Sequence, residues 1–322
     1  MQADPLQRSP PPQNSNAIAT NSDASFVETL EYKRFIEFCD ACRQYRYIGL
    51  CFGPPGVGKT LSALRYSRNE ILAQADPWSA ELEDSPPFDT LFYTPSVMNS
   101  PSRIDSELRR ARETIAGLAR RPLRREAQAA LTAFRTRDDT HRKVELEKPP
   151  HARTEVSSLK PTYLEVFQRY AEQEKALIEP TTLILIDESD RLRMTSLEQI
   201  RAIFDEGGAG LILIGMPGIE KRMARFPQFY SRIGFVHEFR PLGTPEMEAL
   251  LGEHWAPSGV HLPKEPMSAE VTAAIIRMTA GNFRLLNRLL AQIERILDVN
   301  GLAIITTEVV MAARESLVIG QA

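Results

Sequence analysis

The sequence lacks the features that mark membrane, secreted and fibrous proteins. No apolar run approaches the ~18 residues that a membrane-spanning helix needs, and the first 25 residues lack the charged-then-apolar order of a secretion signal. Only 3 cysteines occur in 322 residues, too few for a disulfide framework. The content of 43% hydrophobic and 25% charged residues is that of an average globular protein. We therefore expect a soluble protein of the reducing cytoplasm.

An excess of positive charge is also lacking. The 39 Lys and Arg residues face 42 Asp and Glu residues, for a net charge of −3, so any nucleic-acid contact must come from a local patch. Residues 101–150 hold 13 basic and 8 acidic residues and are one candidate for contact with DNA phosphates. Solvated helix faces with i,i+4 ion pairs, in which Glu113 and Glu126 could take part, are the alternative. The arginines of this stretch, none of which can be ranked above the others, are Arg109, Arg110, Arg112, Arg120, Arg121, Arg124 and Arg125.

Two of the cysteines form a Cys-x-x-Cys pair, Cys39 and Cys42. Such a pair can bind a metal or act in redox chemistry. No second pair and no His-x₃₋₅-His accompanies it, and the surrounding apolar spacing is helical. We favour structural cysteines on a helix.

The apolar pattern divides the chain into an arm and two domains. Residues 1–25 are polar and rich in proline, a composition that cannot bury a core, and we expect a disordered arm. Helical spacing runs from Phe26 to near Arg46 and again over 59–74 and 162–177, with a proline-rich loop at 76–87. Continuous apolar runs, typical of buried parallel strands, occupy 47–52, 90–94, 182–186 and 210–214.

After about residue 241 the strand signals stop. Helical patterns follow over 245–254, 269–280, 283–298 and 307–318, with Pro245 at a first helical position and Ser268 and Thr306 at N-caps. The chain is thus predicted to be an α/β protein: a core over 26–241 with a parallel sheet flanked by helices and a charged insertion at about 101–150, then an all-α domain over 242–322.

The most specific motif is Gly53-Pro-Pro-Gly-Val-Gly-Lys-Thr60, which matches the phosphate-loop pattern G-x-x-x-x-G-K-[ST] in full. It follows a predicted strand and opens a predicted helix, which is the context that supports the motif. Its glycines let backbone N–H groups face phosphates, and the helix N-terminus adds its positive dipole end. Lys59 would reach the β- and γ-phosphates, and the Thr60 hydroxyl would bind Mg²⁺. The predicted nucleotide-binding set is Gly53, Pro54, Pro55, Gly56, Val57, Gly58, Lys59, Thr60 and Leu61.

Two adjacent carboxylates, Asp187 and Glu188, end the apolar run at 182–186. Unpaired charge at the end of a buried strand is unfavourable, and a metal-bound nucleotide would compensate it. Asp187 would hold Mg²⁺ through water, and Glu188 would polarise the attacking water. Together the two motifs indicate an ATP-hydrolysing P-loop protein. With a second acidic residue after the strand, the motif resembles that of AAA+ ATPases rather than that of GTPases. No guanine-recognition motif of the NKxD type is present.

The resemblance to AAA+ proteins implies roles for three further positions. Met216 stands after the 210–214 strand, where these proteins carry a polar sensor 1 residue; this departure puts efficient hydrolysis in doubt. Tyr230-Ser-Arg-Ile-Gly234 resembles the element that presents an arginine finger to a neighbouring subunit, with Arg232 as the first choice and Arg225 as the second. Gly281-Asn-Phe-Arg284 resembles sensor 2, whose arginine reaches the γ-phosphate from a helical lid, so Arg284 joins the nucleotide-binding set. A phosphate partner would also explain an arginine at a helix start, where the macrodipole disfavours it.

Less generic segments narrow the resemblance to transposon-encoded AAA+ ATPases of the TniB, TnsC and MuB type, which regulate DNA transposition. The less generic segments are 26–39, 213–218 and 281–288, and the phosphate loop at 53–60 accompanies them. The resemblance implies an ATP- and Mg²⁺-dependent homo-oligomer, a ring or a filament, that assembles on double-stranded DNA of any sequence. It would recruit a transposase, with other target-selection proteins of the same element as possible partners, and hydrolysis at subunit interfaces would disassemble it.

Two alternatives stay open at this point. A replication initiator or clamp-loader-like ATPase shares the Ser-Arg and Gly-x-x-Arg elements, although no winged helix is visible after residue 241. A secretion or signalling ATPase would not bind DNA, and a membrane segment or a cell-wall-binding tail would support it; neither is visible in the sequence.

Overall fold

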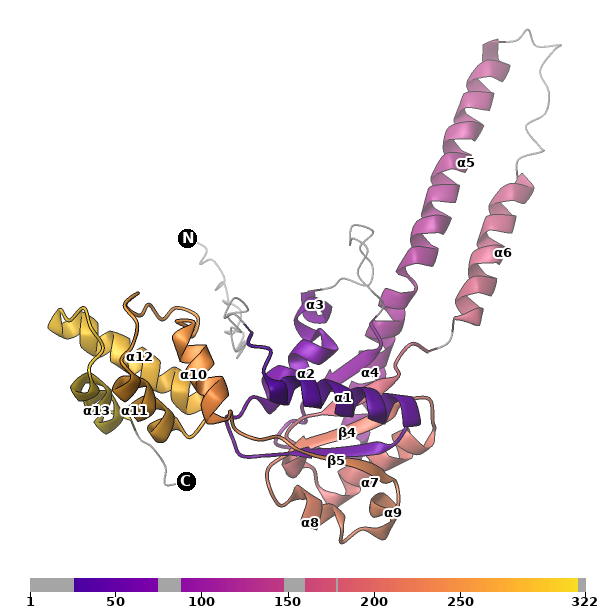
Figure 1. Ribbon diagram of the computed structural model, residues 1–322. Coiled ribbons are helices and arrows are strands. Elements are labelled where there is room, and N and C mark those ends of the chain that lie inside the picture. The colour runs from indigo at the N-terminus through magenta and orange to yellow at the C-terminus, as the bar shows by residue number, and fades with distance from the viewer. Residues whose placement is uncertain (1–25, 75–87, 148–159, 178, 318–322) are drawn as a thin grey trace, which may run out of the picture.

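The computed structural model describes residues 26–74, 88–147, 160–177 and 179–317 (Figure 1). The expected disordered arm at 1–25 and the proline-rich loop at 76–87 lie outside these residues. Within the described ranges, no helix combines the length and the apolar character that crossing a bilayer requires.

A five-stranded parallel sheet forms the centre of the core. Its strands are β1 (Ile48–Phe52), β2 (Thr90–Tyr93), β3 (Leu183–Ile186), β4 (Gly210–Gly215) and β5 (Ile233–Glu238), in the order β2-β3-β4-β1-β5. The four predicted strands are confirmed. The order places β1 and β3, which carry the two predicted motifs, on either side of β4. Because the strands are parallel, both motifs follow the carboxyl ends of their strands and lie on the same side of the sheet.

The fifth strand was not predicted. β5 pairs with β1 at the edge of the sheet, and its residues alternate between half-buried and exposed. An edge strand with one solvated face lacks the continuous apolar run of a central strand. The segment was instead interpreted only as an arginine-bearing element.

Helices cover both faces of the sheet (Figure 1). Successive strand residues point to opposite faces, so Ile48 and Leu50 pack toward α4 (Pro101–Ala119), α7 (Met194–Asp205) and α8 (Ile219–Met223). Cys51 packs toward α1 (Leu30–Tyr45). The short helix α9 (Pro227–Tyr230) follows α8 and leads into β5.

The Cys-x-x-Cys pair lies in α1 on the buried side of that helix. Cys39 and Cys42 are fully buried in the apolar layer beneath α1. Burial raises the pKa of Cys39 well above its usual value and that of Cys42 to about 12. Both residues are therefore part of the core packing, as protonated thiols at neutral pH.

The helix predicted at 59–74 is two helices, α2 (Lys59–Ser67) and α3 (Asn69–Gln74). Arg68 separates them in the left-handed conformation (φ 53°) and caps α2 through its backbone N–H. No glycine or proline marks this break, which explains why apolar spacing alone did not reveal it.

The charged segment 101–150 divides into two structurally different parts. α4 belongs to the core, where Ile104, Leu108 and Ile115 are buried against the sheet and α7. At Arg120 the chain leaves the core and continues as α5 (Arg121–Glu147), which runs beside α6 (Lys160–Ala176) in a long projection (Figure 1). The projection thus begins about twenty residues later than the charge pattern indicated, and α6 belongs to it.

The C-terminal part is helical, as predicted, with its own apolar cluster. Its helices are α10 (Thr244–Gly252), α11 (Ala269–Thr279), α12 (Phe283–Asn300) and α13 (Thr307–Glu315). Ser268 and Thr306 cap α11 and α13 through their side chains, as expected. Leu30 N, at the start of α1, donates to Glu246 in α10 and joins this part to the core, while Leu242 N donates to the Gly281 carbonyl within the part itself.

Candidate nucleotide-binding site

The phosphate loop connects β1 to α2, and its glycines have conformations that other residues would not tolerate. Gly56 (φ 85°) and Gly58 (φ 110°) are in the left-handed region, where a Cβ atom is strained. At Gly53 a Cβ would stand 2.1 Å from the carbonyl oxygen of Phe239. The loop can therefore pass close to the residue that follows β5 before α2 begins.

Lys59 lies at the mouth of this loop. Its Nζ donates to the carbonyl oxygens of Gly53 (2.6 Å) and Pro54 (2.8 Å), and the residue is only 9% exposed. Burial lowers the pKa of Lys59, while the nearby acidic groups, Asp187 and Asp190 among them, raise it. The ammonium group is thus held within the loop by two backbone oxygens.

The two predicted magnesium-binding residues lie together. Thr60 Oγ1 donates to Asp187 Oδ2 at 2.6 Å, although the two residues are 127 positions apart. Asp187 is 4% exposed, and its backbone N–H donates to the Tyr93 carbonyl of the neighbouring strand. Among the described residues, no group of three or more His, Cys, Asp or Glu side chains could enclose a metal. A hydroxyl and one carboxylate beside a phosphate loop nevertheless suit Mg²⁺, which keeps several waters and takes its other ligands from phosphates.

Glu188 begins a tight turn directly after Asp187. It has a left-handed backbone (φ 48°, ψ 40°), and its N–H donates to Asp187 Oδ1 at 2.8 Å. A 3₁₀ turn over Ser189–Arg191 follows, and the Arg191 guanidinium forms an ion pair with the Glu188 carboxylate. With a side chain that is 42% exposed, Glu188 is open to solvent beside the buried Asp187.

Met216 follows β4 at the same edge of the sheet and is 40% exposed. Its backbone N–H donates to Asp190 Oδ2 at 2.7 Å. A carboxylate from the turn after β3 therefore occupies the end of β4, where a polar side chain of residue 216 was expected. Sequence reasoning missed Asp190, and its signal was the position of a third acidic residue three places after Asp187.

The helical part brings Arg284 to the phosphate loop. Its backbone N–H donates to the Gly56 carbonyl at 3.1 Å, and a Cβ on Gly56 would stand 2.7 Å from the Arg284 Cβ. The charge of Arg284 contributes to lowering the pKa of Lys59. Asn282 caps α12 with its side-chain oxygen and donates its amide group to the Pro55 carbonyl at 2.8 Å. Asn282 was not predicted; its sequence signal was an N-cap residue just before Phe283.

The other loop residues of the predicted nucleotide-binding set differ in burial. Val57 is buried in the apolar layer under α1, while Leu61 is exposed on the first turn of α2. Pro54 and Pro55 contribute carbonyl oxygens to Lys59 and Asn282. Val57 therefore anchors the loop in the core, and the carbonyls of Pro54 and Pro55 hold Lys59 and Asn282 beside the loop.

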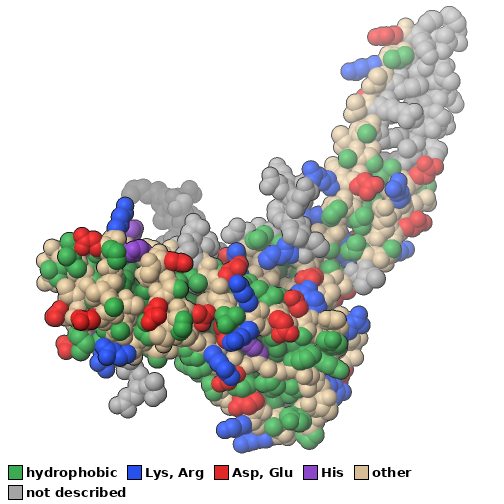
Figure 2. Space-filling view, viewed as in Figure 1, with side chains coloured by type: hydrophobic (Ala, Val, Ile, Leu, Met, Phe, Trp, Pro, Cys, Tyr) green, Lys and Arg blue, Asp and Glu red, His purple; other side chains and the backbone are tan. Residues whose placement is uncertain are grey.

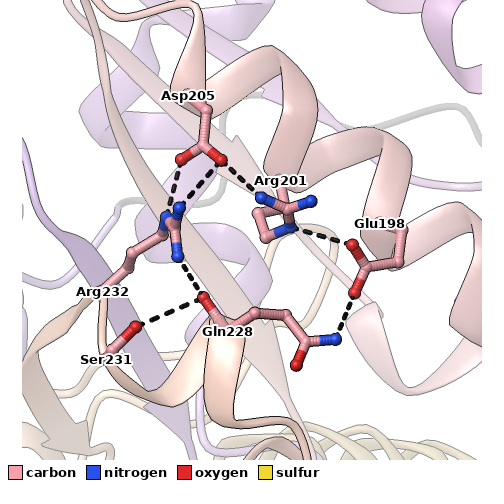
Figure 3. A network of polar contacts seen from close by, with 6 residues as sticks. All are labelled: Glu198, Arg201, Asp205, Gln228, Ser231 and Arg232. Carbon is pink, nitrogen blue, oxygen red and sulfur yellow. Dashed lines mark hydrogen bonds and ion pairs between the residues drawn. The ribbon is translucent and has the colours of Figure 1, made fainter.

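Arg232 lies at the amino-terminal end of β1 and β5, whereas the phosphate loop follows the carboxyl-terminal end of β1. Its carbonyl accepts the Ile48 N–H at the start of β1. The guanidinium donates to both carboxylate oxygens of Asp205 (2.6 and 3.0 Å) and to the Gln228 carbonyl. Figure 3 shows this contact as part of a network that also joins Arg201 and Glu198. Arg225, the second choice, is exposed and lies between α8 and α9.

Several arginines of the charged segment have partners within the chain. Arg103 and Arg109 pair with acidic residues four positions away along α4, as the alternative interpretation expects. Arg120 and Arg124 contact α6, and Glu126 pairs with Arg169 across the projection rather than along its own helix. On the face in Figure 2, basic and acidic side chains are interspersed along the projection. Among the described residues of this segment, these four arginines therefore already have partners within the chain.

Comparison with known proteins assigns the core to a family. A family model described as an AAA domain matches residues 42–223. The chain belongs to the AAA domain family. A Staphylococcus aureus protein described as a "Potential ATP-binding protein" is 40% identical over 305 residues, which cover 92% of this chain and 97% of that protein.

Among solved structures, a point mutant of RuvB from Thermotoga maritima superposes with a TM-score of 0.51 at 14% identity, over 92% of this chain and 71% of the RuvB chain. A second point mutant of the same protein gives a TM-score of 0.50 at 14% identity, over 91% and 70% of the two chains. At this identity the likeness concerns the fold. The predicted AAA+ P-loop fold is confirmed, and the binding of ATP by this domain stays a prediction.

Proposed function

We propose that this protein is an ATPase that assembles on duplex DNA in its ATP-bound form and there recruits or regulates a transposase. The resemblance of residues 26–39, 213–218 and 281–288 to transposition regulators motivates the proposal. The observation that supports assembly into oligomers is the position of Arg232. β1 has five residues, so Arg232 lies about 16 Å or more from the phosphate loop of its own chain, and it can act only on a neighbour's nucleotide.

In the proposed reaction, Lys59 and the loop N–H groups bind the phosphates, and Thr60 and Asp187 would hold Mg²⁺, which would neutralise phosphate charge. Glu188 accepts a proton from water as the water oxygen bonds to the γ-phosphorus and the bond to the β,γ-bridging oxygen breaks. Arg284 approaches from the helical part of the same chain. Arg232 of the next subunit would complete the site. ATP then lies between subunits, which makes assembly depend on the nucleotide.

The role of Arg232 can be separated from its structural contacts. We expect Arg232→Ala to abolish most hydrolysis while ATP binding remains, because a finger acts on the transition state. Arg201→Ala is the matched control, since Arg201 contacts the same Asp205 in the network of Figure 3. If loss of that network were the cause, Arg201→Ala would lower the phosphate-release rate as much as Arg232→Ala.

A mixing experiment then tests action between subunits. Arg232→Ala protein contributes intact phosphate loops, and Lys59→Ala protein contributes intact fingers. We expect the mixture to recover part of the activity that neither protein has alone. No recovery at any ratio, in mixtures shown to co-assemble, would count against a finger that works on the neighbouring subunit.

The DNA proposal predicts assemblies that depend on the nucleotide. A chain with a net charge of −3 can hold polyanionic DNA only through many weak local contacts acting together. We therefore expect rings or filaments on duplex DNA of any sequence with ATP or a non-hydrolysable analogue, and none with ADP. Binding should weaken steeply with salt as bound phosphates regain counterions. Electron microscopy and mobility shifts with each nucleotide measure this.

A transposase should bind these assemblies and raise their rate of hydrolysis. A monomer on DNA with both nucleotides, or assemblies that ignore DNA, would overturn the transposition proposal. Monomers on DNA would favour an initiator-like ATPase, and assemblies without DNA would favour a secretion or signalling ATPase.

A further inference from the structure

Asn99 has an unusual position for an amide side chain. It lies between β2 and α4 and is 5% exposed, so each polar atom of its side chain needs a partner inside the protein. Its Nδ2 donates to the carbonyls of Ser96 (3.2 Å) and Arg191 (3.0 Å). Its Oδ1 accepts from Ser196 Oγ (2.7 Å) and from the Arg193 N–H (3.5 Å). All of these partners except Ser96 lie more than ninety positions away, in the segment after β3.

The Asn99 amide therefore fastens the turn that carries Glu188. Arg191, whose carbonyl accepts from Asn99, is the last residue of the 3₁₀ turn, and its guanidinium pairs with Glu188 Oε2. That contact uses one carboxylate oxygen and leaves Oε1 for a water molecule. Glu188 itself has a left-handed backbone, a conformation that persists only when its surroundings hold it.

We propose that Asn99 is a positioning residue for ATP hydrolysis: through the main chain of Arg191 it holds the ion pair that orients the Glu188 carboxylate. This inference rests on the proposed role of Glu188 as the group that accepts the proton from water. It does not depend on DNA or on a transposase, and it concerns the rate of the chemical step rather than the binding of ATP. Loss of the amide donor lets the turn relax, which moves the carboxylate away from the water.

The variant that tests this link is Asn99→Asp. The new carboxylate keeps the size of the side chain and an acceptor for Ser196, but it faces the carbonyls of Arg191 and of the neighbouring Ser96 with an oxygen in place of the N–H donor. We expect kcat for ATP to fall about ten- to hundredfold, because small displacements of reacting groups have effects of this size, with KM nearly unchanged. Ser196→Ala is the matched control: it removes a donor from the same buried cluster but leaves the link to Arg191, so its kcat should stay close to wild type.

Arg191→Ala provides a second, independent test, since Arg191 is exposed and its removal does not endanger the core. It should lower kcat as Asn99→Asp does, and the double variant should lose no more than either single variant, because both break one route. An unchanged or raised kcat in Arg191→Ala overturns the proposal. A raised kcat would mean that the ion pair between Arg191 and Glu188 inhibits hydrolysis. A KM that rises with the fall in kcat for Asn99→Asp, or an equal loss in Ser196→Ala, also overturns it. Glu188→Gln in the same assay separates the two levels: if that variant turns over normally, the proposed base is wrong.

Discussion

Glu188→Gln is expected to stop turnover while the protein still binds ATP. The amide has the shape of the carboxylate but cannot accept a proton from water, and removal of a general base typically lowers the rate ~10²–10⁴-fold. Lys59 and the pair of Thr60 and Asp187 (2.6 Å) are left in place, so ATP affinity should stay close to wild type. Phosphate release and nucleotide binding, measured on the same preparation, test both halves of this expectation.

Glu174→Gln is a suitable control for this experiment. Glu174 has a side-chain exposure of 36%, close to the 42% of Glu188, and it also pairs with an arginine, Arg120. It lies at the base of the projection and not at the phosphate loop, so its substitution should leave turnover unchanged. Normal hydrolysis by Glu188→Gln would mean that another group activates water. Loss of ATP binding would mean that Glu188 belongs to the binding residues.

The sequence predicted the parts of the site that are contiguous in the chain. The phosphate loop and the pair of acidic residues after β3 follow from local patterns: an apolar strand, glycines at fixed spacing, and a helix start. Their meeting at one edge follows from the parallel sheet, because the carboxyl ends of parallel strands share an edge. Arg284 was predicted from the resemblance to sensor 2, and its contact with Gly56 joins segments more than two hundred residues apart.

The parts that sequence patterns missed depend on contacts between distant segments. Asn99 is a polar residue in a loop, and nothing near it in the chain indicates that its amide reaches Arg191. Asp190 likewise acquires its position from β4. β5 is an edge strand whose pattern is set by pairing with β1. Such residues derive their roles from packing, which periodicity and composition do not record.

The Lys59→Ala variant is expected to bind ATP measurably more weakly than the wild-type protein while it stays folded. Lys59 brings the point charge of the loop to the phosphates, and its Nζ is already desolvated and held by the Gly53 and Pro54 carbonyls. A hydrogen bond to a charged group contributes about 1.5–3 kcal/mol, so the affinity for ATP should fall about ten- to hundredfold. Titration with a fluorescent ATP analogue measures the affinity, and competition with unlabelled ATP checks the specificity.

Thermal unfolding separates lost binding from lost folding. A ligand that binds only the folded state raises the melting temperature, so ATP at a concentration that saturates the wild-type protein should stabilise it far more than the Lys59→Ala variant. Without nucleotide the two proteins should melt at similar temperatures, because the Lys59 side chain packs at the mouth of the loop and not in the apolar layers of the sheet. Arg284→Ala is the matched control: it removes a second positive charge near the loop, but an exposed one, and it should retain a larger part of the shift that ATP produces. An undiminished shift in Lys59→Ala would mean that the phosphates bind elsewhere, and the assignment of residues 53–60 as the phosphate loop would then be wrong.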